Sequence, residues 1–189
     1  AAGAADPQVP LHAVQVLDEA ERRQALTGRN DAAATGVHDL VAERAAGIPD
    51  AVAVVCGDEW LSYGELVGRA LLLAGVLRRA GVGAESVVGV CLEREAQLVV
   101  AVLGVWLAGA AYLPLDPEYP VERLEFMVAD SGADVVVSHR GIARGLAARV
   151  VWLDEPGVRA ELAAPGAGPA AAAVAPGQLA YVIYTSGSS

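Results

Sequence analysis

Short apolar runs rich in β-branched residues alternate with longer helical patterns through the middle of the chain. Residues 86–91, 134–138 and 149–153 are largely apolar and of strand length, which is typical of strands buried on both faces of a parallel sheet. Parallel neighbours need crossover connections, so this alternation predicts right-handed β–α–β units. We therefore expect an α/β fold with a mostly parallel sheet flanked by helices.

The segments before the first of these runs have clear start and stop signals. Residues 37–46 are predicted to be helical, and residues 51–61 to form a short β-hairpin. Ser62 is followed three positions later by Glu65, a capping box that predicts a helix ending near Gly81. The local chemistry thus predicts a helix, a hairpin and a second helix in order.

Residues 98–115 contain no charged side chain and approach the length of a membrane span. Gly104 and Gly109 interrupt the run, however, and Pro114 lies near its end. A core helix over residues 96–108, followed by an extended segment, accounts for the whole run. We therefore expect no membrane-spanning helix.

Beyond this point, Pro120 fits the first position of a helix that is predicted to end at Gly132. Residues 141–148 are predicted to form a short helix. Residues 163–177 are almost wholly Ala, Gly and Pro, a composition that favours a flexible or surface loop.

The amino-terminal residues differ from the rest. Residues 1–10 are expected to be loose, and a capping box predicts a short charged helix over residues 19–27. This helix is either a solvated surface element or part of a linker. We predict an arm over residues 1–36 and a domain over residues 37–189.

The charge of the chain and the spacing of its cysteines and histidines argue against nucleic-acid binding and against a metal site. The net charge is −10 and all 13 basic residues are arginines, which argues against nucleic-acid binding. Cys56 and Cys91 form no CxxC pair and are expected to be buried free thiols. The histidines lack the spacing of a metal site; they are His12, His38 and His139. No secretory signal is recognisable, so the expected location is cytoplasmic.

The last eleven residues, LAYVIYTSGSS, combine a strand-like run with a loop of small polar residues. Glycine allows close backbone approach, and successive N–H groups and hydroxyls suit a phosphate. A flexible tail is the alternative. Neither a P-loop nor a nucleophile elbow fits the pattern. The candidate phosphate-binding residues are Thr185, Ser186, Gly187, Ser188 and Ser189.

This run resembles the start of the phosphate-loop signature of adenylate-forming enzymes. LSYGEL (residues 61–66) and LAGAAYLPLD (residues 107–116) resemble, in the right order, the first two core motifs of nonribosomal peptide synthetase adenylation domains. LDEAERRQALTGRND (residues 17–31) is similar to the linker between condensation and adenylation domains. The resemblance implies the first part of the large N-terminal domain of an adenylate-forming enzyme.

That resemblance also implies the chemistry. Such enzymes join an amino acid carboxylate to the α-phosphate of ATP with Mg²⁺, release pyrophosphate, and pass the aminoacyl group to the phosphopantetheine thiol of a carrier domain. The implied partners are the amino acid, carrier and condensation domains of the same assembly line, and a small MbtH-like activator protein. The five residues from Thr185 to Ser189 would contribute backbone amides and hydroxyls to the ATP phosphates.

Some features depart from the family pattern. Leu107 stands where the second motif usually has lysine, and the chain has no lysine at all. The phosphate-loop signature is incomplete, so we expect no catalytic residue within these residues and no activation of an amino acid by them alone. Two alternatives remain: a non-catalytic interaction module, and a fragment of an acyl-CoA or aryl-acid ligase.

Overall fold

A computed structural model describes residues 36–143, 145–164 and 168–185. The predicted arm over residues 1–36 and its helix over residues 19–27 lie outside the described residues, apart from Gly36. The helices and strands, in chain order, are α2 (Val37–Gly47), β1 (Val52–Cys56), β2 (Glu59–Ser62), α3 (Tyr63–Arg79), β3 (Val87–Cys91), α4 (Ala96–Leu107), β4 (Ala111–Pro114), α5 (Val121–Ser131), β5 (Val135–Ser138), β6 (Arg149–Trp152) and α6 (Pro156–Leu162).

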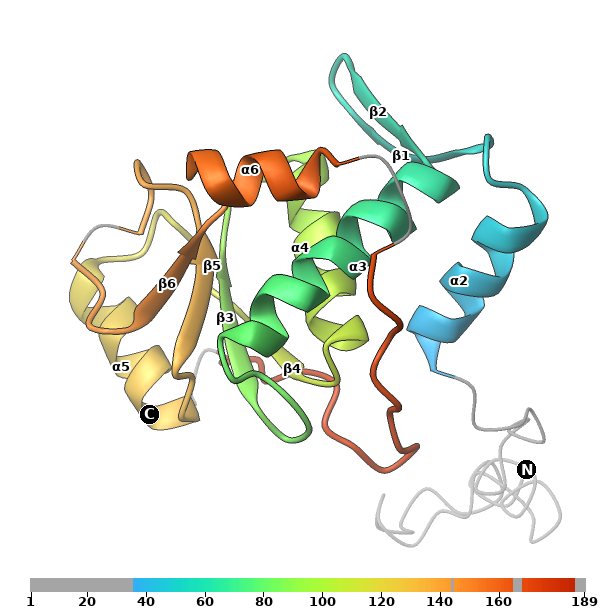
Figure 1. Cartoon of the computed structure of the whole chain (residues 1–189). Helices are drawn as coiled ribbons and strands as arrows, with labels where there is room; N and C mark the ends of the chain where they lie inside the picture. Colours follow the sequence, from blue (N-terminus) through green and yellow to red (C-terminus); the bar gives the residue numbers. More distant parts are fainter. Residues whose placement is uncertain (1–35, 144, 165–167, 186–189) are drawn as a thin grey trace, which may run out of the picture. The chain divides into compact units, whose positions relative to one another are not determined.

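The main sheet has four parallel strands in the order β4-β3-β5-β6 (Figure 1). Val88 in β3 pairs with Tyr112 on one side and with Val135 on the other. β3 therefore lies inside the sheet, as its continuous apolar sequence predicts. The hairpin β1–β2 forms separately and is antiparallel, with Val55 opposite Trp60. The predicted α/β class and the hairpin are confirmed.

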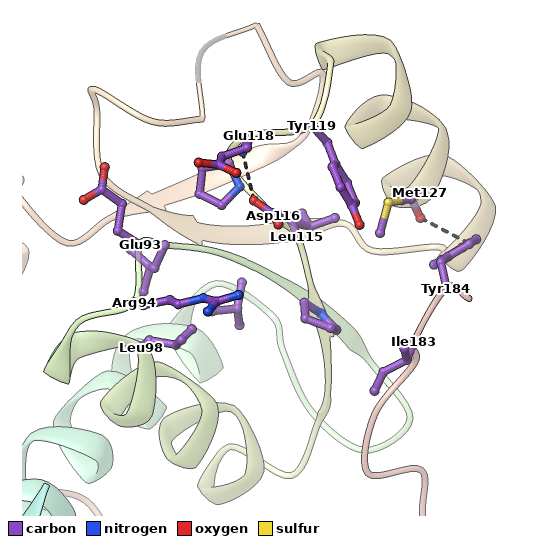
Figure 2. A pocket seen from close by; sticks show the side chains of 14 residues that line it. Glu93, Arg94, Leu98, Leu115, Asp116, Glu118, Tyr119, Met127, Ile183 and Tyr184 are labelled. Carbon is purple, nitrogen blue, oxygen red and sulfur yellow. Dashed lines mark hydrogen bonds between the residues drawn. The ribbon is translucent and has the colours of Figure 1, made fainter. Parts of the chain in front are cut away.

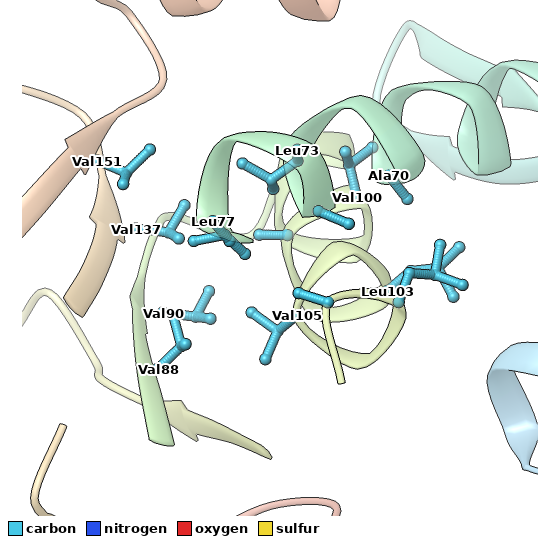
Figure 3. Packing of buried hydrophobic residues seen from close by; sticks show 14 of the residues in the cluster. Ala70, Leu73, Leu77, Val88, Val90, Val100, Leu103, Val105, Val137 and Val151 are labelled. Carbon is cyan, nitrogen blue, oxygen red and sulfur yellow. The ribbon is translucent and has the colours of Figure 1, made fainter. Parts of the chain in front are cut away.

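Helices cover both faces of this sheet. On one face, α3 and α4 pack against β3, β5 and β6 through Leu73, Leu77, Val90, Val137 and Val151 (Figure 3). On the other face, α5 packs through a smaller apolar cluster that includes Cys91, Leu113, Leu124, Met127 and Val136. The side chains of successive residues in the buried strands thus point to opposite faces of the sheet.

The contact between α3 and α4 is close because α4 carries a glycine there. A Cβ atom on Gly104 would lie 3.0 Å from Leu73 Cδ2 and 3.1 Å from the carbonyl oxygen of Ala70. The small residue lets the two helix backbones approach. No helix among the described residues is both long and apolar enough to span a membrane.

Two helix ends follow their local sequence signals. Ser62 Oγ accepts a hydrogen bond from Glu65 N (3.2 Å), and Glu65 Oε2 accepts one from Ser62 N (2.9 Å), which completes the predicted capping box. Gly132 ends α5 with a left-handed φ of 69°. Pro120 is the N-cap of α5, one position before the predicted one.

One predicted helix is wrong and one observed helix was not predicted. Residues 141–143 and 145–148 are turns and bends, not a helix, because Gly145 has a φ of 86° and the one turn hydrogen bond joins Ile142 N to the carbonyl of His139 (2.9 Å). The helix α6 follows β6 and contacts α3. None of its residues is buried, so it has no strong apolar pattern to reveal it.

The Ala/Gly/Pro-rich stretch over residues 163–177 is a surface segment, as predicted, and its part over residues 168–177 is hydrogen-bonded to the rest of the domain. Arg78 Nη1 donates to the carbonyl of Ala170 (2.7 Å), and Ala172 N donates to that of Leu107 (2.9 Å). Directly after it, Gln178 Nε2 donates to the carbonyl of Gly109. Small side chains allow this close approach to the helices. Of the two predicted alternatives, a flexible or a surface loop, the structure shows the surface loop and adds these hydrogen bonds to the helices.

The run over residues 179–184 is less regular than predicted. It makes a single parallel bridge, Tyr112 with Tyr181, on the outer side of β4. Its two backbone hydrogen bonds join Tyr112 N to the carbonyl of Ala180 (3.3 Å) and Val182 N to the carbonyl of Tyr112 (3.0 Å). The run is extended and parallel to β4, but it is not a full strand because it pairs with the sheet at one point only.

Candidate functional site

The connections leaving β3 and β4 diverge to opposite faces of the sheet. After β3 the chain enters α4 on the α3 side, and after β4 it enters α5 on the other side. In doubly wound sheets, such a switch point opens a crevice beyond the carboxyl ends of the two strands, and ligands bind there. The topology therefore predicts a ligand site beyond the carboxyl ends of β3 and β4.

A cavity of about 730 Å³ lies at this switch point (Figure 2). Its walls come from the end of β3 and the start of α4, from the turn after β4, from α5, and from the run beside β4. The lining residues are Val90, Leu92, Glu93, Arg94, Leu98, Pro114, Leu115, Asp116, Pro117, Glu118, Tyr119, Met127, Ile183 and Tyr184.

The charged part of the wall is more acidic than basic. Among the lining residues, Glu93, Asp116 and Glu118 are opposed by one cation, Arg94. Asp116 Oδ1 accepts a hydrogen bond from Glu118 N (3.0 Å), so these two residues form a polar turn instead of an acid–base pair. Within the described ranges, no group of three or more His, Cys, Asp or Glu side chains could hold a metal ion. An anionic ligand here would need counter-charge from elsewhere.

Tyr184 fixes one end of the terminal run against α5. Its hydroxyl donates a hydrogen bond to Asp130 Oδ2 (2.5 Å) and lies 3.4 Å from the carbonyl oxygen of Met127. Its ring meets Phe126 edge to face, with centroids 6.1 Å apart. Burial and the neighbouring Asp130 carboxylate raise the pKa of Tyr184 to about 12, so the hydroxyl remains a donor at neutral pH.

Aromatic side chains hold the other end of the same run. Trp106 Nε1 donates to the carbonyl of Ala180 (2.9 Å). The Tyr112 ring lies between Trp106 and Tyr181, with centroid separations of 5.7 and 5.9 Å. The run is thus tied to α4 at its start and to α5 at its end.

The predicted phosphate-binding residues begin where this run ends. Thr185 is exposed and directly follows Tyr184, which lines the cavity. Ser186, Gly187, Ser188 and Ser189 lie outside the described residues. Binding of phosphate by these five residues therefore remains a prediction.

Sequence reasoning missed several residues of the cavity. Glu93 and Arg94 follow a buried parallel strand, a position that could have marked them as candidates. Tyr184 also lines the cavity, but its pairing with Asp130 outside the cavity carried no such signal, because it spans 54 positions of the chain.

The environment of the buried thiol near the cavity disfavours the reactive thiolate form. Cys91 is fully buried, and burial raises the pKa of its thiol to about 11. Ser138 Oγ donates to the carbonyl of Cys91 (2.6 Å) and so ties β5 to β3 behind the site. Both cysteines are free thiols, and Cys91 is buried as predicted, whereas Cys56 is only partly buried.

Fold and cavity define a doubly wound α/β protein with a ligand crevice at its switch point. The chain belongs to the AMP-binding enzyme family, whose model matches residues 41–189. It is 37% identical to tyrocidine synthase 3 of Brevibacillus parabrevis over 97% of its length, and 37% identical to bacitracin synthase 1 of Bacillus licheniformis over 96%. It spans only 3% and 4% of those proteins.

Solved structures agree with this assignment. The chain superimposes on the nonribosomal peptide synthetase FmoA3, in its form bound to α-methyl-L-serine-AMP, with a TM-score of 0.69 and 30% identity, over 78% of this chain and 17% of that one. VinN in complex with 3-methylaspartate gives a TM-score of 0.70 at 27% identity, over 82% of this chain and 45% of that one. The similarity to nonribosomal peptide synthetases thus holds in both sequence and fold.

Proposed function

We propose that this chain is part of an adenylation domain that activates an amino acid in a nonribosomal peptide synthetase. An oxygen of the amino acid carboxylate attacks the α-phosphorus of ATP, the bond to the β-phosphate oxygen breaks, and aminoacyl-AMP and pyrophosphate form. The main support is the position of Tyr184 and Thr185 beside the cavity at the switch point. The binding of α-methyl-L-serine-AMP by the structural relative FmoA3 is consistent with this reaction.

In this proposal the chain's own groups bind and orient phosphates. The backbone amides and hydroxyls of the loop from Thr185 to Ser189 would hold the β- and γ-phosphates while charge develops on the leaving pyrophosphate. No protein nucleophile is needed for this step. The acidic cavity wall disfavours a free polyanion, so the triphosphate must arrive with its charge partly neutralised.

Mg²⁺ is proposed only as the counter-ion that accompanies ATP. The described residues offer no three-ligand cluster for it, and no residue is assigned to it. Transfer of the aminoacyl group to a phosphopantetheine thiol, and carrier, condensation and MbtH-like partners, extend the proposal by analogy with the family. The arm over residues 1–36 would be the linker to the condensation domain.

The test is ATP–pyrophosphate exchange by the complete protein encoded by the gene of this chain, assayed across the amino acids. Exchange that depends on one amino acid and is abolished by EDTA supports the proposal. Exchange with aryl or fatty acids instead would indicate the acyl-CoA or aryl-acid ligase alternative. No exchange, together with tight binding of a protein partner, would indicate an interaction module.

The 189 residues alone are expected to give only background exchange, because they contain no lysine to contact ATP or the acyl carboxylate. Exchange above background by these residues alone would contradict this expectation.

A further inference from the structure

The run that leads into Thr185 has little backbone pairing with the sheet. Each pair of neighbouring strands in the main sheet shares four register positions, whereas this run makes one bridge, at Tyr181. Its two hydrogen bonds to the sheet both involve the backbone of Tyr112. Among the described residues, backbone pairing of this run with β4 extends to Val182, and the side chain of Tyr184 adds contacts with α5 beyond that point.

We propose that Tyr184, held by Asp130 of α5, is a positioning residue that sets where Thr185 lies relative to the cavity between β3 and β4. This inference rests on the proposed function, since Thr185 opens the predicted phosphate loop. Tyr184 is not a catalytic residue, because in this role it acts through the chain that follows it.

The geometry indicates that the contacts of the Tyr184 side chain with Asp130 and Phe126 of α5, called the Tyr184 anchor here, hold the end of the run in place. A hydrogen bond of 2.5 Å to a carboxylate is short and charge-assisted, a class that is stronger than neutral hydrogen bonds. The edge-to-face contact with Phe126 fixes the ring plane as well. All of these contacts are made to α5, which packs on the sheet through Leu124, Met127 and Val128. The anchor therefore stands on a rigid element.

The anchor also positions part of the cavity wall. Ile183 and Tyr184 line the cavity together with Met127 of α5 (Figure 2). Loss of the Tyr184 hydroxyl would remove the hydrogen bond to Asp130 from the contacts between the run and α5 and so weaken the placement of the run. Because phosphoryl chemistry depends on placement within about 1 Å, this loss should impair use of ATP more than use of the amino acid.

The test uses four variants of the complete protein, the fourth of which is Asp130→Ala. Tyr184→Phe keeps the ring contact and removes the hydroxyl, and Asp130→Asn keeps an acceptor oxygen for that hydroxyl. Tyr181→Phe is the matched control, with the same atom removed three residues earlier on the same run, where the ring contact with Tyr112 is retained. Tyr184→Phe is expected to raise the KM for ATP about tenfold without changing the KM for the amino acid, as for loss of a hydrogen bond to a charged group.

Asp130→Asn should keep a KM for ATP close to that of the wild type, because the amide oxygen still accepts the hydrogen bond from Tyr184. Asp130→Ala should raise the KM for ATP as Tyr184→Phe does. Equal KM values for ATP in Tyr184→Phe and Tyr181→Phe would overturn the inference. A second outcome would also overturn the inference: a fall in kcat that equals the loss of folded protein, with both KM values unchanged. It would show that Tyr184 has only a structural role.

Amide hydrogen exchange separates this inference from the proposed function. Peptides covering residues 181–185 should exchange faster in Tyr184→Phe than in Tyr181→Phe, whether or not the wild-type protein catalyses ATP–pyrophosphate exchange. If exchange of these amides differs but no adenylation occurs, the anchor stands and the proposed function fails. If amide exchange is the same in both variants, the anchor is refuted even when adenylation is active.

Discussion

Ser62 and Glu65 each satisfy a backbone N–H group of the other at the start of α3. The hydrogen bond from Ser62 N, with further help from the Ser62 hydroxyl and from Arg69, lowers the pKa of Glu65 below its usual value of 4.5. A carboxyl group with a lowered pKa in the folded state stabilises the fold only while it is ionised. Its contribution is thus complete above pH 4.5 and is lost as the pH falls through the lowered pKa.

Glu65→Gln should therefore destabilise the domain in a pH-dependent way. At pH 7 the free energy of unfolding should fall by about 0.5 kcal/mol, which is typical of a carboxylate at an exposed helix N-terminus. The difference from wild type should shrink towards zero as the pH falls below 4.5. Urea denaturation at a series of pH values measures it, and a difference that stays constant from pH 7 to pH 3 would contradict the argument.

The capping box could be predicted because its two residues are three positions apart and their chemistry is local. The anchor of Tyr184 could not, because Asp130 comes close only after a helix, two strands and a long surface segment have been placed. The same holds for Trp106, whose indole reaches Ala180 across 74 positions. Local patterns thus predict where elements begin and end, whereas the contacts that shape the candidate site depend on the assembled fold.

Among the elements, the best predicted are those with a buried stripe. The helix α3 buries Leu66, Ala70, Leu73, Ala74 and Leu77, which recur at helical spacing. The helix α6 has no fully buried residue, and Gly145 has a positive φ that breaks a helical path, so neither segment could be predicted correctly from periodicity. For residues 168–177, Ala, Gly and Pro carry no periodic pattern, so the sequence predicts a surface loop but not the contacts that these small residues make with the helices.

The pair α3 and α4 offers a test at the level of elements. Gly104→Ala would place a methyl group 3.0 Å from Leu73 Cδ2 and 3.1 Å from the carbonyl oxygen of Ala70, so the Leu73 side chain and the α3 backbone would have to shift. We expect a loss of about 1–3 kcal/mol in the free energy of unfolding.

Gly68→Ala in α3 is the matched control, because no atom lies within 4 Å of its added Cβ. Helix propensity should make this control slightly more stable, by up to about 1 kcal/mol. Equal effects of the two changes in thermal or urea denaturation would show that the helix contact is less close than the structure describes.

At the scale of the whole molecule, the parallel sheet follows from the order of strands and helices, but its strand order does not. Periodicity predicts that β3, β5 and β6 are buried, yet it is silent on whether β4 or β5 lies next to β3. In the structure β3 has both as neighbours. That arrangement sends the connections after β3 and β4 to opposite faces and creates the cavity. The position of the candidate site is therefore a property of the topology and not of any motif.

The central place of β3 also makes its cysteine a reporter for opening of the whole domain. Cys91 has no exposed surface, and its thiol has a pKa of about 11, so it should not react with a thiol reagent at pH 8 in the folded state. Because β3 pairs on both sides and is covered on both faces, its exposure requires disruption of the entire core.

In a Cys56→Ala background, the rate of Cys91 labelling should increase with denaturant concentration, with the slope expected for global unfolding. The Cys91→Ala variant, which keeps the half-buried Cys56, should label faster and with little dependence on denaturant. A weak denaturant dependence for Cys91 would mean instead that the carboxyl edge of the sheet, where the candidate site lies, opens without the rest.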